Sequence, residues 1–210
     1  MNYRSFLKWD NQTRTGSPGA PDDRSGDVYL EDPLLRLAAE TAIVTQRPLL
    51  LRGEPGCGKS SFAPFAARNL NWRYYEATVT GRTKAKDLLW QFDGLARLRD
   101  AQAQEQDVAT ARFVTPGILW WAFNPDDARD FSARATAKVR KKSTLAPPEE
   151  PSRALNEKRD SERAVVLIDE LDKADPDVPN DLLEVFGLHR FRVDDAQHPV
   201  ERKFPEPSAD

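Results

Sequence analysis

The chain has 210 residues, of which 39% are hydrophobic and 31% charged, and its formal net charge is −3. A chain of this length holds one domain with extensions, or at most two small domains. The nearly balanced charge excludes a strong overall attraction to nucleic acid or anionic membranes, so we expect neither as a partner.

The single cysteine and the lack of long apolar runs point to the compartment. One cysteine cannot form an internal disulfide, which favours a reducing environment. The first residues lack the apolar core of a signal peptide, and no run of about 18 apolar residues, as a membrane span needs, occurs anywhere. The sequence therefore predicts a cytoplasmic protein without a membrane segment.

The N-terminal part is predicted to be a leader followed by a helix. Residues 10–27 are rich in Gly, Pro and small polar residues, with too little apolar surface to offset the entropy lost on ordering. We therefore expect residues 1–27 to form a flexible leader and the ordered domain to begin near Val28. Asp32 and Pro33 suit the N-cap and first turn of a helix.

The next segment alternates between strand and helix patterns. Leu49–Leu51 is a short apolar run typical of a strand buried in a parallel sheet. A helix is predicted to begin at Lys59, although Pro64 within it removes a backbone donor. Aromatic and β-branched residues then predict a second strand over residues 72–79. Strand, loop, helix and strand together form a βαβ unit.

The middle of the chain carries weaker patterns. Short helices are expected over residues 83–92 and 94–107, before a turn and the apolar run 118–123. This run contains two adjacent Trp residues, for which a packed core is favoured over a ligand surface. Residues 124–163 combine prolines with a basic cluster, and a charged, solvated insertion loop is favoured over a patch for nucleic acid or another anionic partner.

The C-terminal part contains the strongest strand pattern in the chain. Val165–Ile168 is a run of branched apolar residues that ends in an acidic pair. A helix is predicted over residues 178–188 and a short strand over residues 189–193. Residues 194–210 are expected to be an irregular tail, so the ordered domain is expected to span residues 28–193.

Residues 53–60 satisfy the pattern G-x-x-x-x-G-K-[ST], which is typical of a phosphate-binding loop between a strand and a helix. Glycines in such a loop let backbone N–H groups approach phosphate oxygens, and the helix start adds a positive dipole end. Lys59 is predicted to reach the β- and γ-phosphates, and the Ser60 hydroxyl to coordinate Mg²⁺. The predicted nucleotide-binding residues are Gly53, Glu54, Pro55, Gly56, Cys57, Gly58, Lys59, Ser60 and Ser61.

The acidic pair Asp169 and Glu170 stands at the carboxyl end of a predicted buried strand, where α/β sheets bind ligands. Asp169 can hold Mg²⁺ opposite Ser60, and Glu170 is placed to orient or deprotonate an attacking water. An acidic pair at a strand end is more often a turn or capping feature, but a phosphate loop earlier in the chain reverses that preference. Hydrolysis is favoured over transfer to an organic acceptor, since no acceptor-binding motif is apparent.

The segments LLLRGEPGCGKSSFA and AVVLIDELDKADPDVPNDLLEVF resemble the Walker A and Walker B elements of AAA+ ATPases, and the MoxR-like branch in particular. The resemblance implies an α/β P-loop NTPase fold, a parallel sheet flanked by helices, that binds ATP and Mg²⁺. It implies catalytic roles for Lys59 and Glu170, metal binding by Ser60 and Asp169, and adenine contacts around Val28 and Tyr29. It further implies ATP hydrolysis coupled to remodelling of a protein substrate, within a homo-oligomeric ring.

AAA+ proteins continue after the Walker B helix with a sensor strand, an arginine finger and a helical lid, and residues 194–210 are too few to hold these parts. We therefore expect a module that is incomplete at its C-terminal end, with a gap in the sheet between the two motif strands. An alternative is a nucleotide-binding switch, or an inactive fragment whose site a second polypeptide completes. A P-loop kinase or a nucleic-acid motor is a third reading.

Overall fold

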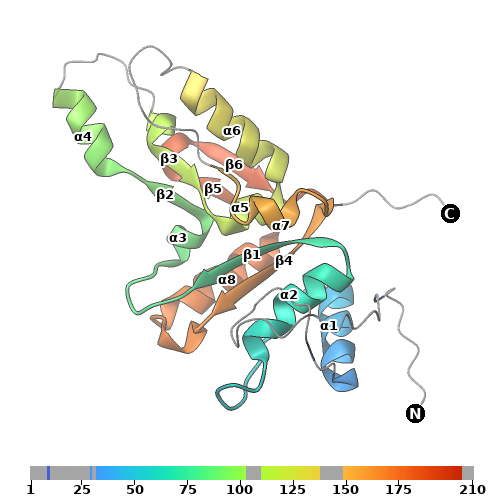
Figure 1. Ribbon diagram of the computed structural model, residues 1–210. Coiled ribbons are helices and arrows are strands. Elements are labelled where there is room, and N and C mark those ends of the chain that lie inside the picture. The colour runs from blue at the N-terminus through green and yellow to red at the C-terminus, as the bar shows by residue number, and fades with distance from the viewer. Residues whose placement is uncertain (1–8, 10–28, 30–31, 103–109, 138–148, 205–210) are drawn as a thin grey trace.

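The computed structural model describes Trp9, Tyr29 and residues 32–102, 110–137 and 149–204 (Figure 1). The segments outside this part include the predicted flexible leader except Trp9, the centre of the basic segment at residues 138–148, and the tail beyond residue 204. In the described part, a central pair of parallel strands has helices on both faces, which is the α/β architecture that the sequence predicts.

The first two helices begin as their sequences require. Helix α1 spans Pro33–Thr45, and Asp32 caps it by accepting a 2.8 Å hydrogen bond from the Leu34 N–H. Helix α2 spans Lys59–Asn69 and continues through Pro64, whose side chain is buried. The predicted start of a helix at Lys59 is therefore confirmed.

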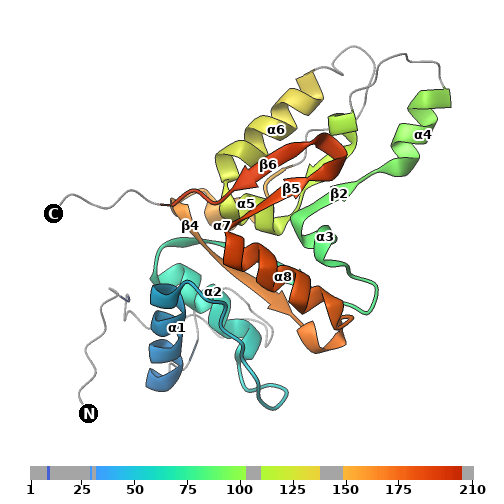
Figure 2. The same ribbon diagram turned by 180° about the vertical axis from the view of Figure 1, so that it is seen from behind.

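The central sheet pairs β1 (Trp72–Thr78) with β4 (Asp160–Asp169) in parallel, with Thr78 opposite Asp169. Alternate residues of the two strands face opposite sides. On one face, Tyr74 and the neighbouring apolar residues of β4 pack against Ala63 and Ala67 of α2. On the other face, the two strands pack into the main core (Figure 2).

Shorter elements surround this centre. They comprise α3 (Ala85–Leu89), β2 (Trp90–Phe92), α4 (Gly94–Gln102), β3 (Val114–Pro116), α5 (Ile118–Phe123), α6 (Pro125–Ala137), α7 (Arg153–Asn156), α8 (Asp177–Leu188), β5 (Arg190–Val193) and β6 (His198–Glu201). Strand β2 pairs with β3, and β5 with β6, each antiparallel. Three single turns of 3-10 helix complete the described part: Thr110–Phe113, Leu171–Lys173 and Asp194–Ala196.

The main core is rich in aromatic residues. Trp120 and Trp121 of α5 are 0% and 2% exposed, so the prediction that this Trp pair is packed core is confirmed. Trp120 lies 4.9 Å from Phe131 of α6, measured between ring centroids. Its indole N–H donates to the Asp127 carboxylate at 2.8 Å, which satisfies the polar end of a buried ring.

Four expectations about local structure are wrong. Residues 90–92, predicted as the end of a helix, form β2 because they pair with β3. Leu49–Leu51 forms no strand, and Leu50 is 63% exposed, because no neighbouring strand in the described part offers this run a hydrogen-bonding edge. Residues 125–137 form α6 instead of a solvated loop, since Ala128 and Phe131 bury one face of the helix. Residues 198–201 form β6 instead of an irregular tail, with Val200 buried.

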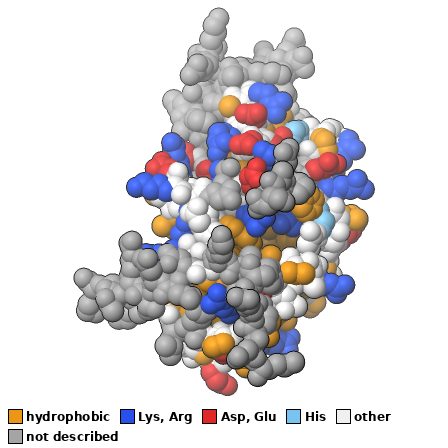
Figure 3. Space-filling view, turned by 90° about the vertical axis from the view of Figure 1, so that its right-hand side faces the viewer, with side chains coloured by type: hydrophobic (Ala, Val, Ile, Leu, Met, Phe, Trp, Pro, Cys, Tyr) orange, Lys and Arg blue, Asp and Glu red, His pale blue; other side chains and the backbone are white. Residues whose placement is uncertain are grey.

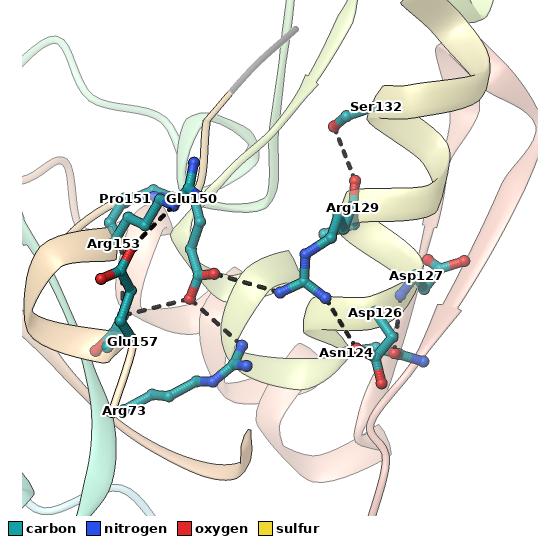
Figure 4. Close-up of polar contacts among 12 residues, drawn as sticks. Arg73, Asn124, Asp126, Asp127, Arg129, Ser132, Glu150, Pro151, Arg153 and Glu157 are labelled. Atoms are coloured by element: carbon teal, nitrogen blue, oxygen red, sulfur yellow. Dashed lines mark hydrogen bonds and ion pairs between the residues drawn. The ribbon is translucent and has the colours of Figure 1, made fainter. Parts of the chain in front are cut away.

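A buried polar cluster fastens residues 149–157 to β1 and α6 (Figure 4). The Glu150 carboxylate accepts hydrogen bonds from the Tyr75 hydroxyl at 2.8 Å, from Arg73 at 3.3 Å and from Arg129 at 3.4 Å. Burial, followed by the hydrogen bond to Glu150, raises the pKa of Tyr75, so this hydroxyl remains a donor. The Asn156 side chain meanwhile pairs with the Tyr74 N–H at 2.9 Å and C=O at 3.2 Å, which covers the outer edge of β1.

Removing the Glu150 carboxylate is expected to destabilise the fold strongly. The Arg73 and Glu150 side chains are only 9% and 10% exposed, so Glu150→Ala leaves a buried cation without its partner. We expect a loss of about 3–5 kcal/mol in the free energy of unfolding, measured by urea denaturation. Glu157→Ala is the matched control, because its ion pair with Arg153 is exposed and is worth about 1 kcal/mol at most. Equal losses in the two variants would contradict the prediction.

Gly117 precedes α5 at a close approach between two backbone segments. A Cβ at this position would lie 2.5 Å from the Leu88 carbonyl oxygen and 2.8 Å from the Leu89 carbonyl carbon, and backbone atoms cannot move aside cheaply. We expect Gly117→Ala to lower the free energy of unfolding by about 1–3 kcal/mol. Gly187→Ala in α8 has open space around its Cβ and is expected to stabilise the protein by about 0.5–1 kcal/mol. Thermal denaturation tests this prediction, because the melting temperature should fall in Gly117→Ala and rise in Gly187→Ala.

The surface carries charges of both signs. On the face shown in Figure 3, Lys and Arg side chains are interspersed with Asp and Glu side chains. This face therefore offers no extended field of one sign to attract a polyanion. Within the described ranges, no helix has both the length and the apolar character that crossing a membrane requires.

Candidate functional site

The loop before α2 has the backbone that its glycines allow. Gly56 and Gly58 have φ angles of 79° and 86°, a left-handed conformation that costs other residues free energy. Gly58 is the N-cap of α2 and also lies under an aromatic ring, since a Cβ there would be 3.3 Å from Cε2 of Tyr29. Two separate constraints therefore require glycine at position 58.

The start of α2 presents backbone donors. The N–H groups of Lys59 and Ser60 lie in the first turn, where no intrahelical acceptor exists, and Gly58 has no side chain to cap them. The Gly58 carbonyl already accepts from the N–H groups of Ser61 and Phe62, at 3.2 and 3.1 Å, so the turn itself is closed. Converging free N–H groups at the positive end of a helix form an anion-binding site.

The Lys59 side chain folds back over the loop. Its ammonium group donates to the Gly53 carbonyl at 2.8 Å and to the Glu54 carbonyl at 2.7 Å, and lies 3.6 Å from the Cys57 sulfur. The cation is thus held inside the loop without a carboxylate partner at these contacts. Phosphate oxygens can replace the two carbonyls with a stronger, charge-assisted contact.

The chain path brings the two sequence motifs to the same end of the sheet. Only Leu70 and Asn71 separate α2 from β1, and α2 packs along both strands, so α2 runs antiparallel to them. The start of α2 at Lys59 therefore lies toward the carboxyl ends of β1 and β4, as Figure 1 shows. The loop that contains Ser60 and the acidic pair at the end of β4 therefore lie toward the same end of the sheet, the end at which α/β folds bind ligands.

Asp169 and Glu170 differ in their contacts. The Asp169 backbone carbonyl accepts from the Val79 N–H at 2.9 Å, and its carboxylate accepts from the Glu170 N–H at 3.0 Å. Glu170 has a φ of 60°, so the chain turns sharply after β4. Its carboxylate forms a 2.7 Å ion pair with Lys173, and this hydrogen bond is the main cause that raises the pKa of Lys173.

The Lys173 contact was not anticipated from the sequence. Its signal was present in the segment Glu-Leu-Asp-Lys, because residues three apart in a helical turn face each other. The pair is exposed, at 56% and 42% for the two side chains, and is therefore weak enough to open.

The donor chemistry fits magnesium. Ser60 offers a hydroxyl and Asp169 a carboxylate, both oxygen ligands of the kind that Mg²⁺ prefers. Among the described residues, no group of three or more His, Cys, Asp and Glu side chains could hold a metal by itself. Mg²⁺ usually keeps several waters and binds, together with substrate phosphates, through one or two protein oxygens, which Ser60 and Asp169 could supply.

Tyr29 lies beside the loop, where the resemblance places the adenine contacts; Val28, which the resemblance also implies, lies outside the residues that the structure describes. Its ring packs 4.8 Å from Phe65 and 5.9 Å from Phe62, measured between ring centroids. Burial, followed by the nearby Cys57 thiol and Asp32 carboxylate, raises the pKa of Tyr29. The ring therefore forms an uncharged wall next to Gly58.

Comparison with known proteins gives a family and no individual relative. A family model described as AAA domain (dynein-related subfamily) matches residues 48–206, which includes both motifs and the β5–β6 hairpin. No curated protein and no solved structure matches this sequence. Because the match covers most of the chain and agrees with the α/β architecture, the chain belongs to the dynein-related AAA domain family of P-loop nucleotide-binding ATPases.

Proposed function

We propose that the chain binds ATP together with Mg²⁺ at residues 53–61 and hydrolyses it, with Asp169 and Glu170 completing the site. The observation that supports the proposal is that the open start of α2 at Lys59 and the acidic pair at the end of β4 lie toward the same end of the sheet. Family membership supports nucleotide binding and ATPase activity in general.

Each residue of the proposed site has a separate role in binding or hydrolysis. The loop N–H groups and the Lys59 ammonium bind the polyphosphate, and the residues that would hold Mg²⁺ are Ser60 and Asp169. When bound, this ion neutralises charge that develops on the phosphates. Glu170 accepts a proton from the attacking water, whose oxygen bonds to the γ-phosphorus while the bond to the bridging oxygen breaks, releasing ADP and phosphate. Glu170 must exchange its contact with Lys173 for this water.

The finer assignment follows the resemblance in the sequence. The segment from β4 through α8 is similar to the MoxR-like branch, so we assign the chain to that branch. We further propose that hydrolysis drives remodelling of a protein substrate, with the chain acting in a homo-oligomeric ring in the cytoplasm.

Phosphate release from Mg-ATP by the purified chain tests this function. We expect turnover that EDTA abolishes, because the site contains few protein ligands for the metal. Folded protein that binds Mg-ATP but releases no phosphate would remove the hydrolytic part of the proposal. Failure to bind Mg-ATP would remove the whole proposal.

A nucleotide-binding switch that needs a second chain is the alternative, and the sheet gives a reason to keep it. In the described part, β4 pairs only with β1, and its apolar run Val165–Ile168 is half-buried although its pattern is typical of a fully buried strand. A second polypeptide that adds a strand at this edge would bury the run. This alternative predicts Mg-ATP binding without turnover, and turnover once a chain supplying a strand and an arginine is added.

A further inference from the structure

Trp9 is buried although its neighbours in sequence are polar. The indole is 8% exposed and packs in a cluster with residues of α1 and α2. Its ring lies 6.3 Å from Phe65 of α2, between centroids, in a stacked arrangement. Trp9, which precedes α1 by more than twenty residues, therefore contacts the helix that begins at the phosphate loop.

The polar end of this Trp completes a buried charge pair. Its indole N–H donates to the Glu40 carboxylate at 2.8 Å, and Glu40 is fully buried in α1. Arg36, one helical turn earlier, lies 3.6 Å from the same carboxylate, and its guanidinium stands 5.0 Å from the Trp9 ring centroid. A buried carboxylate costs free energy unless donors surround it, so this pair favours the docked Trp9.

Ring contacts extend from Trp9 to the loop. Phe65 contacts both Trp9 and Tyr29, with 4.8 Å between the Phe65 and Tyr29 centroids. Tyr29 in turn lies against Gly58, at the start of α2. A continuous series of packed rings therefore runs from Trp9 through Phe65 to Tyr29. It ends at Gly58, the N-cap of α2, next to the free backbone N–H groups of the anion site.

We propose that Trp9 is a positioning residue of the phosphate loop: by docking on Glu40 and Phe65 it fixes Tyr29 against Gly58 and holds residues 53–60 in the conformation that receives a polyphosphate. The statement that this conformation receives a polyphosphate rests on the proposed nucleotide binding. The statement that Trp9 holds the loop conformation concerns the chain alone and can be tested without any nucleotide.

Hydrogen exchange on the full chain without nucleotide tests the positioning directly. The readout is the exchange rate of the Ser61 and Phe62 amides, which donate to the Gly58 carbonyl. We expect Trp9→Ala to raise these rates by about threefold to tenfold, the range that loss of one aromatic contact predicts. Trp9→Phe keeps a ring against Phe65 but loses the donor to Glu40, and is expected to give a smaller increase.

Phe131→Ala is the matched control for loss of stability. Phe131 is also a buried aromatic residue, but it lies in the main core and not in the cluster that contains Trp9. We expect this variant to lower the melting temperature and to leave exchange at Ser61 and Phe62 unchanged. Unchanged exchange in folded Trp9→Ala, or an equal increase in Phe131→Ala, would overturn the proposal.

A nucleotide titration then separates this proposal from the function on which it rests. With Mg-ADP, we expect Trp9→Ala to raise the Kd by about threefold to tenfold, whereas kcat at saturating Mg-ATP stays within about twofold, because Trp9 touches no reacting group. If Trp9→Ala bound Mg-ADP with the wild-type Kd, Trp9 would have no role in nucleotide binding. If the wild type did not bind Mg-ADP, the proposed function would be overturned. The hydrogen-exchange result would then still decide whether Trp9 positions the loop.

Discussion

Lys59→Ala is expected to weaken Mg-ADP binding on the order of 100-fold, the largest effect that a single substitution should have on binding. The Lys59 ammonium is held inside the loop by the Gly53 and Glu54 carbonyls, where the proposed function places the phosphates. Hydrogen bonds from a charged donor are worth about 1.5–3 kcal/mol each, and a loss of about 3 kcal/mol in total, the low end for two contacts, corresponds to this factor. Isothermal titration calorimetry gives the Kd.

Lys158→Ala is the control for the loss of one positive charge. Lys158 is an exposed residue after α7, far along the chain from the loop, and its removal changes the net charge equally. We expect this variant to bind Mg-ADP with the wild-type Kd. A folded Lys59→Ala protein that binds as tightly as the wild type would show that the loop does not receive the phosphates.

Glu170→Gln is expected to reduce kcat for Mg-ATP hydrolysis by about 10²–10⁴-fold while the Kd for Mg-ADP stays within about threefold. Glutamine keeps the shape of the side chain but cannot accept the proton of the attacking water. The substitution also removes the ion pair with Lys173, which is exposed and contributes little to stability. Phosphate release under saturating Mg-ATP measures kcat.

Asp172→Asn provides the comparison for this variant. Asp172 is an exposed carboxylate in the same turn, two residues beyond Glu170, and no step of the proposed hydrolysis uses it. It should hydrolyse ATP at nearly the wild-type rate. Full activity in Glu170→Gln, or an equal loss in Asp172→Asn, would remove Glu170 as the base.

The parts of the fold that local chemistry determines were predictable. The phosphate-loop pattern of residues 53–60 was recognisable from the spacing of its glycines, and its glycines permit the left-handed backbone that Gly56 and Gly58 adopt. The start of α2 at Lys59 follows from the glycine-rich loop directly before it, and β4 follows from its run of branched apolar residues. Family membership agrees with the fold class that these motifs predict.

Features that depend on distant partners were not predictable. Leu49–Leu51 has the composition of a strand, but a strand needs a paired edge, and the described structure gives it none. Helix α6 lies in a charged segment where only Ala128 and Phe131 signal a buried face. The docking of Trp9 joins residues 31 positions apart through Glu40, a relation that no local pattern encodes.

Calorimetric titration of the folded chain with Mg-ADP, beside the variant Asp169→Asn, tests the shared magnesium site most directly. Asparagine retains an oxygen that can accept the Glu170 N–H, so the turn after β4 is preserved while the anionic metal ligand is lost. We predict one bound nucleotide per chain in the wild type, and binding in the variant that is weaker and no longer strengthened by Mg²⁺. No measurable binding by the wild type, or identical dependence on Mg²⁺ in both proteins, would contradict a nucleotide site formed between the phosphate loop and β4.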